Sequence, residues 1–518
     1  MPFRSLKPDV SIPNVTHTEF VLGKARSRGD KPALICAATN RTLTYRELAE
    51  QVRSVAAGFS RRGIGKGDVV AIWSPNSPEY AVIFHAVATL GATLMTANPS
   101  YTPDELAFQL KDARAKMLVT VSAILDKAME AAKTAPQRID VLTTDESDKV
   151  PSVASIAVDA DPPPVTIDPA NDVMVLPYSS GTTGLPKGVM LTHRNLVANL
   201  IQIDAMEGPD MGTLLGVLPF FHIYGMVVIM NFGLMRGETI VTLPRFDLET
   251  ALKILQDHKI KLAHLVPPIV VALGKHPVVD KYNLSSLRYI FSGAAPLGVE
   301  LTNAVQKRLS LTIRQGYGMT EASPVTHYTL AGRDKAGTVG FLVPSTEMRI
   351  VDPETGRDAG VGERGEVWIR GPQVMKGYLN NPEATASTVD AGGWLQTGDI
   401  GVQYADGYLE VVDRLKELIK VKGFQVAPAE LEALLLKHPS IADVAVIPVA
   451  DAECGEVPKA VIVTKGDLTA EAVMKFVEEH VAHYKKVRHV AFVQQIPKSP
   501  SGKILRRVLV AQERAAAP

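Results

Sequence analysis

Residues 178–188 read YSSGTTGLPKG, in which three glycines alternate with four serine and threonine hydroxyls and one lysine, Lys187. Glycine lets a backbone approach a ligand closely, and successive backbone N–H groups in such a loop bind oxyanions. The flanking residues 172–177 and 188–191 have strand-like patterns, and a helix is expected to begin near Thr192. The stretch therefore predicts a loop between two strands that holds the phosphates of a nucleotide.

This loop differs from the phosphate loop of Walker-type ATPases. In that motif a glycine precedes the lysine and a serine or threonine follows it, and the loop opens directly into a helix. Here Lys187 follows Pro186 and precedes Gly188. A Walker ATPase is therefore disfavoured. An ordinary hairpin turn is the competing interpretation on chemistry alone, and the length of the polar string counts against it.

The size and charge of the chain narrow the classes of function. A chain of 518 residues exceeds what one hydrophobic core usually supports, so we expect two or more domains. Lysine plus arginine and aspartate plus glutamate both number 55. Nucleic-acid and anionic-membrane binders generally carry a strong positive field, which this balance does not provide. The composition therefore favours small-molecule partners, with no nucleic acid, and a monomer or a homodimer.

Targeting and redox signals are also few. Cys36 and Cys454 are far apart and form no metal-ligand pattern, so a reducing, cytoplasmic setting is expected. Residues 1–8 lack the apolar segment of a secretory signal, and the last residues lack a peroxisomal address. The apolar run 80–97 is interrupted by polar residues and glycine, which predicts a buried helix followed by a strand and no membrane span.

The order of patterns predicts an α/β fold. Strand-like and helix-like segments alternate through the first two-thirds, which is typical of layered α/β subdomains with mostly parallel sheets. From about residue 337 short strands and glycine-rich turns indicate a small β-subdomain. A compact α+β unit follows a hinge at 414–416. We therefore predict a large N-terminal domain over 1–414, including the β-subdomain at 337–414, and a small mobile C-terminal lid domain over 415–518.

The loop at 178–188 resembles the signature of the adenylate-forming superfamily, which contains acyl-CoA synthetases, peptide-synthetase adenylation domains and beetle luciferases. Further motifs of that superfamily follow in the right order: QGYGMTE at 315–321, TGD at 397–399, DRLKELIKVKGF at 413–424 and PSGKI at 500–504. LPFFHIYG at 218–225 and GFQVAPAELE at 423–432 are most similar to the 4-coumarate:CoA ligases. The resemblance covers nearly the whole chain.

The resemblance implies a site for ATP and Mg²⁺. The loop and Lys187 would surround the β- and γ-phosphates, Thr320 would bond the α-phosphate, and Glu321 would help to hold the metal. Asp399 and Arg414 would hold the ribose, while Tyr317 would lie against the purine. The residues implied in ATP and AMP binding are Ser179, Ser180, Gly181, Thr182, Thr183, Gly184, Lys187, Gln315, Gly316, Tyr317, Thr320, Asp399 and Arg414.

The resemblance also implies that the C-terminal lid domain presents two different faces to the active site, one for each half-reaction. Lys503 would stabilise the transition state of adenylation, and Lys416 would be the hinge pivot that replaces the Lys503 face with a second one. His222 would gate the channels of the acid and the thiol. The residues implied on the second face are Lys420 and Gln425 in catalysis, with Lys422 and Gly423 lining the pantetheine tunnel of coenzyme A. Without the motif order, these lysines would be interpreted as a solvated surface.

The implied acyl pocket carries no charge, which favours an acid with an apolar tail. Val227 and Phe291 stand where many plant 4-coumarate ligases carry asparagine and lysine, and neither offers a hydrogen bond to a phenolic hydroxyl. Cinnamate-like acids and medium-chain fatty acids are therefore both candidates. The implied pocket comprises Ile223, Tyr224, Val227, Leu265, Phe291, Gly293, Gly316, Gly318, Ala322, Ser323, Pro324 and Val325.

These observations predict an ATP-dependent acid:CoA ligase that forms an acyl-adenylate and then an acyl-CoA thioester, with ATP, Mg²⁺ and coenzyme A as cofactors. A ligase of the 4-coumarate or cinnamate type is favoured. The alternatives are a medium-chain fatty acyl-CoA synthetase, a luciferase-like adenylating enzyme, or an inactive protein that binds acyl-AMP. Lys187, Glu321 and Lys503 together argue against the inactive protein.

Overall fold

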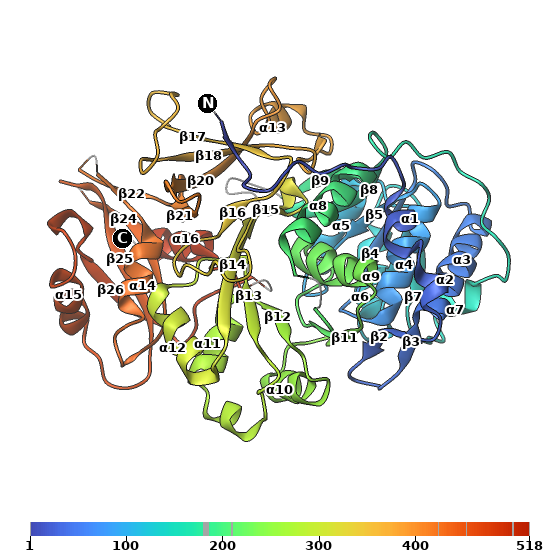
Figure 1. The fold of residues 1–518 in the computed structure, drawn as a ribbon, viewed down its shortest axis with the longest axis horizontal. Helices are drawn as coiled ribbons and strands as arrows, with labels where there is room; N and C mark the ends of the chain where they lie inside the picture. Colours follow the sequence, from blue (N-terminus) through green and yellow to red (C-terminus); the bar gives the residue numbers. More distant parts are fainter. Residues whose placement is uncertain are drawn as a thin grey trace.

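The computed structural model describes residues 2–179, 186–208, 211–422, 424–451, 453–499 and 502–516, which form an α/β fold in layers (Figure 1). The strands of these residues build five sheets. The N-terminal half lies at one end of the molecule, the C-terminal unit lies at the other, and the strands β12 to β16 lie between them. The predicted α/β class, with a smaller α+β unit at the C-terminal end, is confirmed.

The largest sheet carries the glycine-rich stretch at one end of two neighbouring strands. Its strands, in spatial order, are β19 (Gly377–Tyr378), β9 (Lys187–Thr192), β8 (Val173–Ser179), β5 (Thr93–Thr96), β4 (Val69–Trp73), β6 (Met117–Thr120) and β7 (Asp140–Thr143). β8 and β9 are antiparallel, so residues 180–186 join two strands as predicted. Its helices are α1 (His17–Leu22), α2 (Ala25–Arg28), α3 (Tyr45–Arg61), α4 (Pro78–Thr89), α5 (Pro103–Asp112), η1 (Ser122–Ile124), α6 (Leu125–Lys133), α7 (Val153–Ile156) and α8 (His193–Met206).

Two further sheets extend the N-terminal part. One contains β10 (Leu214–Gly216), β11 (Ile240–Thr242), β2 (Pro32–Cys36) and β3 (Thr42–Thr44). The other contains β12 (Leu262–Leu265), β13 (Tyr289–Ser292), β14 (Thr312–Gly318), β15 (Val325–Tyr328) and β16 (Phe341–Leu342). The helical segments in this part are the π-helix η2 (Tyr224–Asn231), α9 (Phe232–Arg236), α10 (Leu248–Asp257), α11 (Pro267–Lys275), η3 (Pro277–Lys281), α12 (Val299–Leu309) and η4 (Thr320–Ala322).

The last two sheets are formed by residues up to Arg414 and by residues after it in the sequence. The first contains β1 (Phe3–Arg4), β17 (Glu347–Val351), β18 (Arg364–Arg370), β20 (Leu395–Gln403) and β21 (Leu409–Arg414), with α13 (Pro382–Ala386) beside it. The second contains β23 (Phe424–Val426), β22 (Ile419–Val421), β25 (Gly455–Thr464), β24 (Ile441–Asp451) and β26 (His489–Phe492). Its helices are α14 (Pro428–Leu435), α15 (Ala470–Glu478), η5 (His483–Lys485) and α16 (Arg506–Ala516).

Local sequence explains where several helices begin. Thr192 ends β9 and caps α8: its side chain accepts from the backbone N–H of Asn195, and the Asn195 side chain accepts from that of Thr192. Such reciprocal capping satisfies backbone donors that a helix start otherwise leaves unpaired. α3 begins with the same arrangement between Thr44 and Glu47. The chain therefore turns sharply from the phosphate-loop strands into a helix.

The apolar side chains divide into separate cores. One continuous core joins the first three sheets and reaches from Val21 to Tyr378. A second lies within the C-terminal sheet, between Ile419 and Val487, and is closed by α14 and α15. A further small cluster, of Ile400, Leu418 and Ala427, joins the C-terminal unit to β20.

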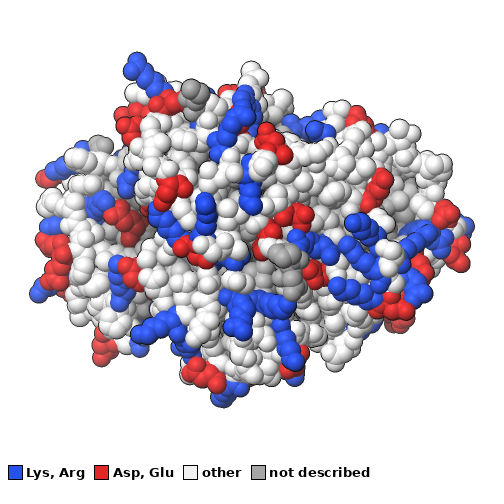
Figure 2. All heavy atoms as spheres, viewed as in Figure 1, with Lys and Arg blue, Asp and Glu red and all other residues white. Residues whose placement is uncertain are grey.

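The surface matches the balanced composition. Figure 2 shows basic and acidic side chains intermixed on the face it displays, with each basic group interrupted by acidic or uncharged residues. Within the described part of the chain, none of the helices combines the length and apolar composition that a membrane crossing needs.

A group of buried histidines holds the first helices together. The backbone N–H of His17 donates to Nδ1 of His193 at 3.2 Å, and the rings of His17 and His85 stack with centroids 5.8 Å apart. The Thr18 hydroxyl lies 3.2 Å from Nδ1 of His85. Burial lowers the pKa of His85 to about 3 and that of His193 to about 4, and it lowers the pKa of His17 as well. All three rings are therefore neutral at pH 7.

We expect this group to make the fold acid-sensitive. Below pH 6.5 the unfolded chain binds a proton at each of these histidines and the folded chain does not, so stability falls as the pH falls towards the folded pKa. Each such histidine reduces the free energy of unfolding by up to about 1.4 kcal/mol per pH unit in that window. His85→Leu should therefore show a smaller drop in thermal midpoint between pH 7 and pH 5 than the wild type. The exposed His483→Leu serves as the control, and an equal drop in all three proteins would contradict this expectation.

Candidate active site

The ends of β8 and β9 hold the start and finish of the glycine-rich loop. Ser179 and Lys187 are paired residues of the two strands. The Ser179 hydroxyl is buried and has no hydrogen-bond partner among the described residues. Lys187 places its ammonium 4.9 Å from the centre of the Tyr378 ring. Other predicted loop residues, Ser180, Gly181, Thr182, Thr183 and Gly184, lie outside the described residues.

Glu321 lies on the other side of Tyr378. Its side chain is only 7% exposed, and the Tyr378 hydroxyl donates to its Oε1 at 2.9 Å. Burial, and next the charge of Glu321, raise the pKa of Tyr378. Thr320 precedes Glu321 in η4 and is half-buried. Tyr378 thus contacts both a cation, through its ring, and a carboxylate, through its hydroxyl. The sequence analysis did not identify it, because a two-residue strand has no readable pattern.

Asp399 connects two further predicted residues. The Tyr317 hydroxyl donates to Oδ2 at 2.5 Å, and Nε of Arg414 lies 3.3 Å from Oδ1. Asp399 and Arg414 are paired residues of β20 and β21, so the sheet itself sets this contact. Burial works against the charge of Arg414, but Asp399 and Glu417 raise its pKa. The predicted ribose-binding pair is therefore held in place together with the predicted purine neighbour.

Two other residues of the QGYGMTE motif shape the backbone nearby. Both ends of the Gln315 side-chain amide bond the backbone of Leu297, at 3.0 and 3.3 Å. Gln315 therefore fixes the segment after β13. A side chain at Gly316 would come within 2.7 Å of the Phe291 ring, so only glycine leaves that ring in place. Gly318 is equally constrained, since a side chain there would meet the carbonyl of Pro324 at 2.1 Å.

Lys503 reaches the same region from the C-terminal unit. Gly502 adopts a φ of +79°, and its Cα lies against Pro268 of α11. Burial, followed by the charge of Arg414, lowers the pKa of Lys503 to about 8, although Glu417 and Asp399 act in the opposite direction. Lys503 is therefore close enough to Asp399 and Arg414 for their charges to act on it.

The charge of Lys503 also affects the pKa of His222. Burial, and next the charge of Lys503, lower the pKa of His222 to about 4, so its ring is neutral at pH 7. The backbone N–H of Tyr224 donates to Nδ1 of His222 at 3.3 Å, which leaves the ring proton on Nε2. His222 thus lies between the Lys503 region and the first residue of η2.

A buried ion network that the sequence analysis missed supports this part of the C-terminal unit. Arg506, three residues after Lys503, donates to Glu417 and to Oε2 of Glu432, the latter at 2.6 Å. Asp413 accepts from the backbone N–H of Ala429 at 2.9 Å, and burial raises its pKa to about 6. The network connects the start of α16 to the segment after Arg414 and to α14.

The residues of the predicted second face of the lid lie away from the site that contains Asp399 and Arg414. Lys420 and Gln425 are paired residues of the β22–β23 hairpin and are exposed. Gln425 lines a cavity of about 190 Å³ with residues of the β17–β21 sheet, among them Asp352 and Arg364. Lys422 is exposed, Lys416 lies in the turn between Arg414 and β22, and Gly423 lies outside the described residues. This structure therefore joins the Lys503 face to the site and leaves the Lys420 face apart from it.

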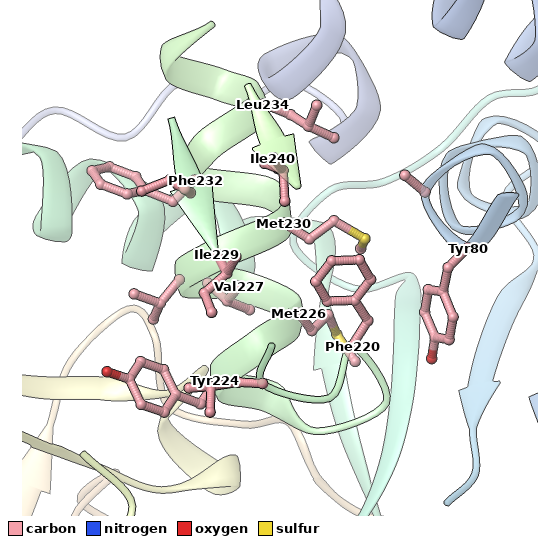
Figure 3. Packing of buried hydrophobic residues seen from close by; sticks show 14 of the residues in the cluster. Tyr80, Phe220, Tyr224, Met226, Val227, Ile229, Met230, Phe232, Leu234 and Ile240 are labelled. Carbon is pink, nitrogen blue, oxygen red and sulfur yellow. The ribbon is translucent and has the colours of Figure 1, made fainter. Parts of the chain in front are cut away.

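The predicted acyl pocket is centred on Tyr224 and Phe291. The Tyr224 hydroxyl donates to the carbonyl of Phe291 at 3.2 Å, and a side chain at Gly293 would meet the Tyr224 ring at 2.9 Å. Figure 3 shows Tyr224 at one end of η2 and Val227 further along that helix. The described pocket residues are buried or nearly so; these are Ile223, Tyr224, Val227, Phe291, Ala322, Ser323, Pro324 and Val325.

The register of β12 and β13 places the predicted pocket residue Leu265 on a different face of the sheet from Phe291. Successive residues of a strand point to opposite faces, and register partners in a parallel sheet share a face. Leu265 is paired with Ser292, whereas His264 is paired with Phe291. Leu265 therefore lies on the face opposite Phe291, and His264 lies on the same face as Phe291. The His264 ring contacts Tyr224 and Phe291, with ring centroids 5.9 and 5.6 Å apart.

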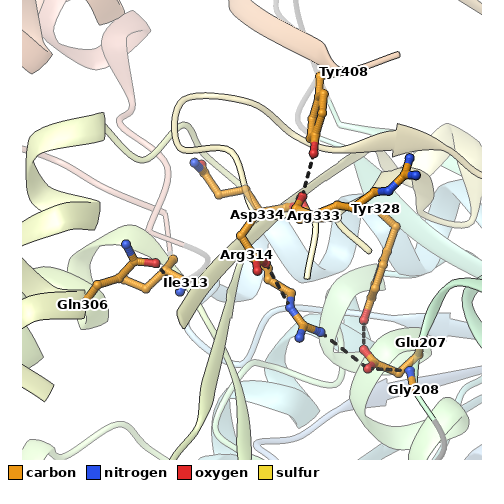
Figure 4. A network of polar contacts seen from close by, with 11 residues as sticks. Glu207, Gly208, Gln306, Ile313, Arg314, Tyr328, Arg333, Asp334 and Tyr408 are labelled. Carbon is orange, nitrogen blue, oxygen red and sulfur yellow. Dashed lines mark hydrogen bonds and ion pairs between the residues drawn. The ribbon is translucent and has the colours of Figure 1, made fainter. Parts of the chain in front are cut away.

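A polar network lies behind Phe291. The Phe291 and Tyr328 rings stack with centroids 4.2 Å apart, and the Tyr328 hydroxyl donates to Glu207. Figure 4 shows Arg314 next to Glu207 and Asp334, with N–O distances of 3.8 and 3.2 Å. The stacked rings thus lie between Tyr224 and the buried ion pair of Arg314 and Glu207.

Two family models match the N-terminal and the C-terminal part of the chain. The model described as "AMP-binding enzyme" matches residues 23–379, and the model of the "AMP-binding enzyme C-terminal domain" matches residues 430–503. The chain belongs to the AMP-binding enzyme family. The resemblance drawn from the ordered motifs is thereby confirmed.

Curated members of the AMP-binding family are similar over their whole length. 4-Coumarate–CoA ligase 2 of Petroselinum crispum is 46% identical over 98% of this chain and 96% of its own length. The 4-coumarate–CoA ligase of Pinus taeda is 44% identical over 98% and 97%.

Solved structures share the fold. The anthranilate CoA ligase AuaEII in complex with anthranoyl-AMP gives a TM-score of 0.89 at 25% identity over 98% of this chain and 99% of its own. ATP-bound MatB from Rhodopseudomonas palustris gives 0.87 at 29% identity, over 96% and 99%. Its apo form gives 0.76 at the same 29% identity, over 97% and 99%. By TM-score, this AMP-binding enzyme is thus more similar overall to the ATP-bound form than to the apo form.

We expect the Arg506 network to be essential for the C-terminal unit. Arg506→Met would leave Glu417 and Glu432 buried without their cation, which costs roughly 3–5 kcal/mol. Thermal unfolding and limited proteolysis of the C-terminal unit should both reveal this loss. The exposed Arg514→Met, on the same helix, should leave both measurements unchanged. Equal behaviour of the two variants would show that the network contributes little.

Proposed function

We propose that this chain is an ATP-dependent acid:CoA ligase of the 4-coumarate or cinnamate type. The acid's carboxylate attacks the α-phosphorus of ATP, the bond to the β-phosphate breaks, and pyrophosphate leaves. The thiol of coenzyme A then attacks the acyl carbon and AMP leaves. The observation that carries this proposal is the cluster of Tyr317, Asp399 and Arg414, next to which Gly502 packs against Pro268 and Lys503 adds its positive charge from the C-terminal unit. Full-length similarity to the 4-coumarate–CoA ligases supports it.

The first half-reaction needs positioning and charge neutralisation more than covalent help from the protein. In the proposed site the hydroxyls of the glycine-rich loop and Lys187 hold the outer phosphates. Asp399 accepts from the ribose hydroxyls and Tyr317 lies at the base. Lys503 stabilises the negative charge that develops on the carboxylate and the α-phosphate, an electrostatic contribution that is largest in a site shielded from water.

The donor set around Glu321 suits Mg²⁺. Its described hydrogen bond from Tyr378 uses Oε1, and a hard cation prefers carboxylate and phosphate oxygens together with water. Among the described residues no group of three or more acidic, histidine or cysteine side chains gathers as a metal site. A magnesium ion held by Glu321 and the nucleotide phosphates would neutralise charge on the leaving pyrophosphate.

The second half-reaction would use the other face of the C-terminal unit. We infer that the unit rotates about Lys416, because Lys420 and Gln425 lie away from the site in this arrangement. After rotation, Lys420 and Gln425 would enter the site, and Lys422 and Gly423 would line the pantetheine tunnel. His222, neutral and placed next to Lys503, would then open the way for the thiol. A cytoplasmic setting, as expected from the sequence, suits these substrates.

The lining of the pocket favours an aryl acid over a medium-chain fatty acid. The rings of Tyr224, His264 and Phe291 meet at its centre, and flat rings pack well against the edges and faces of aromatic side chains. A luciferase-like activity would require oxygen chemistry that none of these contacts suggests.

The proposal predicts two separable products. With ATP, Mg²⁺ and a panel of acids including 4-coumarate, cinnamate and octanoate, pyrophosphate release should depend on the acid, and the acyl-CoA thioester should appear only when coenzyme A is added. Pyrophosphate release can be followed by a coupled assay and the thioester by its absorbance and mass. Absence of acid-dependent pyrophosphate release across the panel would refute the ligase assignment.

A second prediction concerns Lys503. Lys503→Ala should slow acyl-AMP formation by roughly two to three decades, as expected for the loss of one positioned charge. Chemically supplied acyl-AMP should still react with coenzyme A at close to the wild-type rate, because that step uses the other face. An equal loss in both half-reactions, in a folded variant, would contradict the two-face arrangement.

The pKa of Lys503 predicts that acyl-AMP formation depends on pH. A lysine whose pKa lies at about 8 loses its charge as the pH rises through 8, so kcat/KM for acyl-AMP formation should fall above that pH. Lys503→Arg keeps a cation at all these pH values. The fall near pH 8 should therefore disappear in Lys503→Arg, even if the overall rate is lower.

A further inference from the structure

His264 is a buried polar residue with an unused nitrogen. It is only 2% exposed, and its position in β12 places it beside Phe291, on the face of the sheet that looks toward Tyr224. Its Nδ1 lies 3.3 Å from the Tyr224 hydroxyl, whereas its Nε2 has no hydrogen-bond partner among the described residues. A buried polar atom without a partner is rare in native proteins and often marks a place where a ligand completes the pairing.

The neutral ring of His264 can either donate or accept. Burial lowers its pKa to about 3, so the ring carries one proton at pH 7, on one nitrogen. The Tyr224 hydroxyl has one proton and two acceptors within reach, the carbonyl of Phe291 at 3.2 Å and Nδ1 of His264 at 3.3 Å. If it donates to the carbonyl, Nδ1 donates to Tyr224 and Nε2 becomes an acceptor. If it donates to Nδ1, Nε2 becomes a donor.

The apolar residues of the predicted acyl pocket restrict which part of the acid could pair with Nε2. Val227, Phe291 and Ile223 are apolar and at most 3% exposed, so a charged group brought beside them would lose its water without gaining a counter-ion. A neutral hydroxyl fits best, because it can donate and accept and so matches either tautomer of the ring. A methyl group or a hydrogen atom in the same place would leave Nε2 unpaired.

We propose that Nε2 of His264 hydrogen-bonds a hydroxyl at the buried end of the acid, which makes hydroxylated aryl acids such as 4-coumarate the preferred substrate class. This inference rests on the proposed ligase function and specifies its substrate. It also explains how a pocket with Val227 and Phe291 can accept a phenol: the polar partner comes from β12 and not from those two positions.

The wild-type enzyme provides the first test. 4-Coumarate, 4-methylcinnamate and cinnamate differ only in a hydroxyl, a methyl group or a hydrogen atom at one ring position. The kcat/KM for acyl-AMP formation should be higher for 4-coumarate than for either analogue by roughly tenfold, because only the hydroxyl pairs with Nε2. Equal values for 4-coumarate and 4-methylcinnamate would overturn the proposal without any variant.

The variant His264→Leu provides the second test. The ratio of kcat/KM for 4-coumarate to that for cinnamate should fall by roughly tenfold, because only 4-coumarate loses a hydrogen bond in the variant. His85→Leu is the matched control: it removes an equally buried histidine from α4, far from this pocket, and should keep the wild-type ratio. An unchanged ratio in His264→Leu, or an equal fall in His85→Leu, would overturn the proposal.

The same measurements distinguish an error in the role of His264 from an error in the proposed ligase function. If no acid in the series releases pyrophosphate with the wild type, the ligase assignment fails. If the acids are activated but the hydroxyl makes no difference, the ligase assignment stands and the role of His264 is refuted.

Discussion

The carboxylate of Asp399 is the contact on which the rest of the site depends. It is 6% exposed, and a carboxylate buried to this degree is costly unless it is paired and hydrogen-bonded. Tyr317 and Arg414 provide those partners, one from β14 and one from the last residue of β21. Because Arg414 is also the last residue before the C-terminal unit, the pair that shapes the proposed nucleotide site also sets the direction in which the chain leaves it.

The contacts between the C-terminal unit and the rest suit a unit that changes position. Lys437 pairs with Glu300 at 2.5 Å across this boundary, Gly502 lies against Pro268, and Gly298 of the loop before α12 lies near Ala433. A partly exposed ion pair contributes little net stability, and small side chains give few atoms to the contact. Lys503 meanwhile lies near Arg414, a like charge.

The sequence predicted those features that depend on local pattern. The run LPYSSGTTGLPKGVML, at residues 176–191, predicts two strands with a polar loop between them, and β8 and β9 agree. The sequence did not indicate which residues of β12 share a face with Phe291, because the four residues of that strand are all buried and their alternation cannot be read. Tyr378 and Arg506 were missed for a different reason. Their partners lie 57 and 89 residues away, and no local periodicity reports such contacts.

The first strand of the chain pairs with one of the later ones. β1 lies beside β17, and Arg4 donates to Glu347, 343 residues further along. During synthesis at about 5–20 residues per second, the N-terminal strand therefore waits on the order of half a minute before its partner has been made. Since β18, β20 and β21 follow β17 in the sequence, β1 can pair with β17 before the rest of that sheet has been made. The earliest residues of the chain thus form the edge of a sheet whose other strands all lie at least 343 residues beyond Arg4.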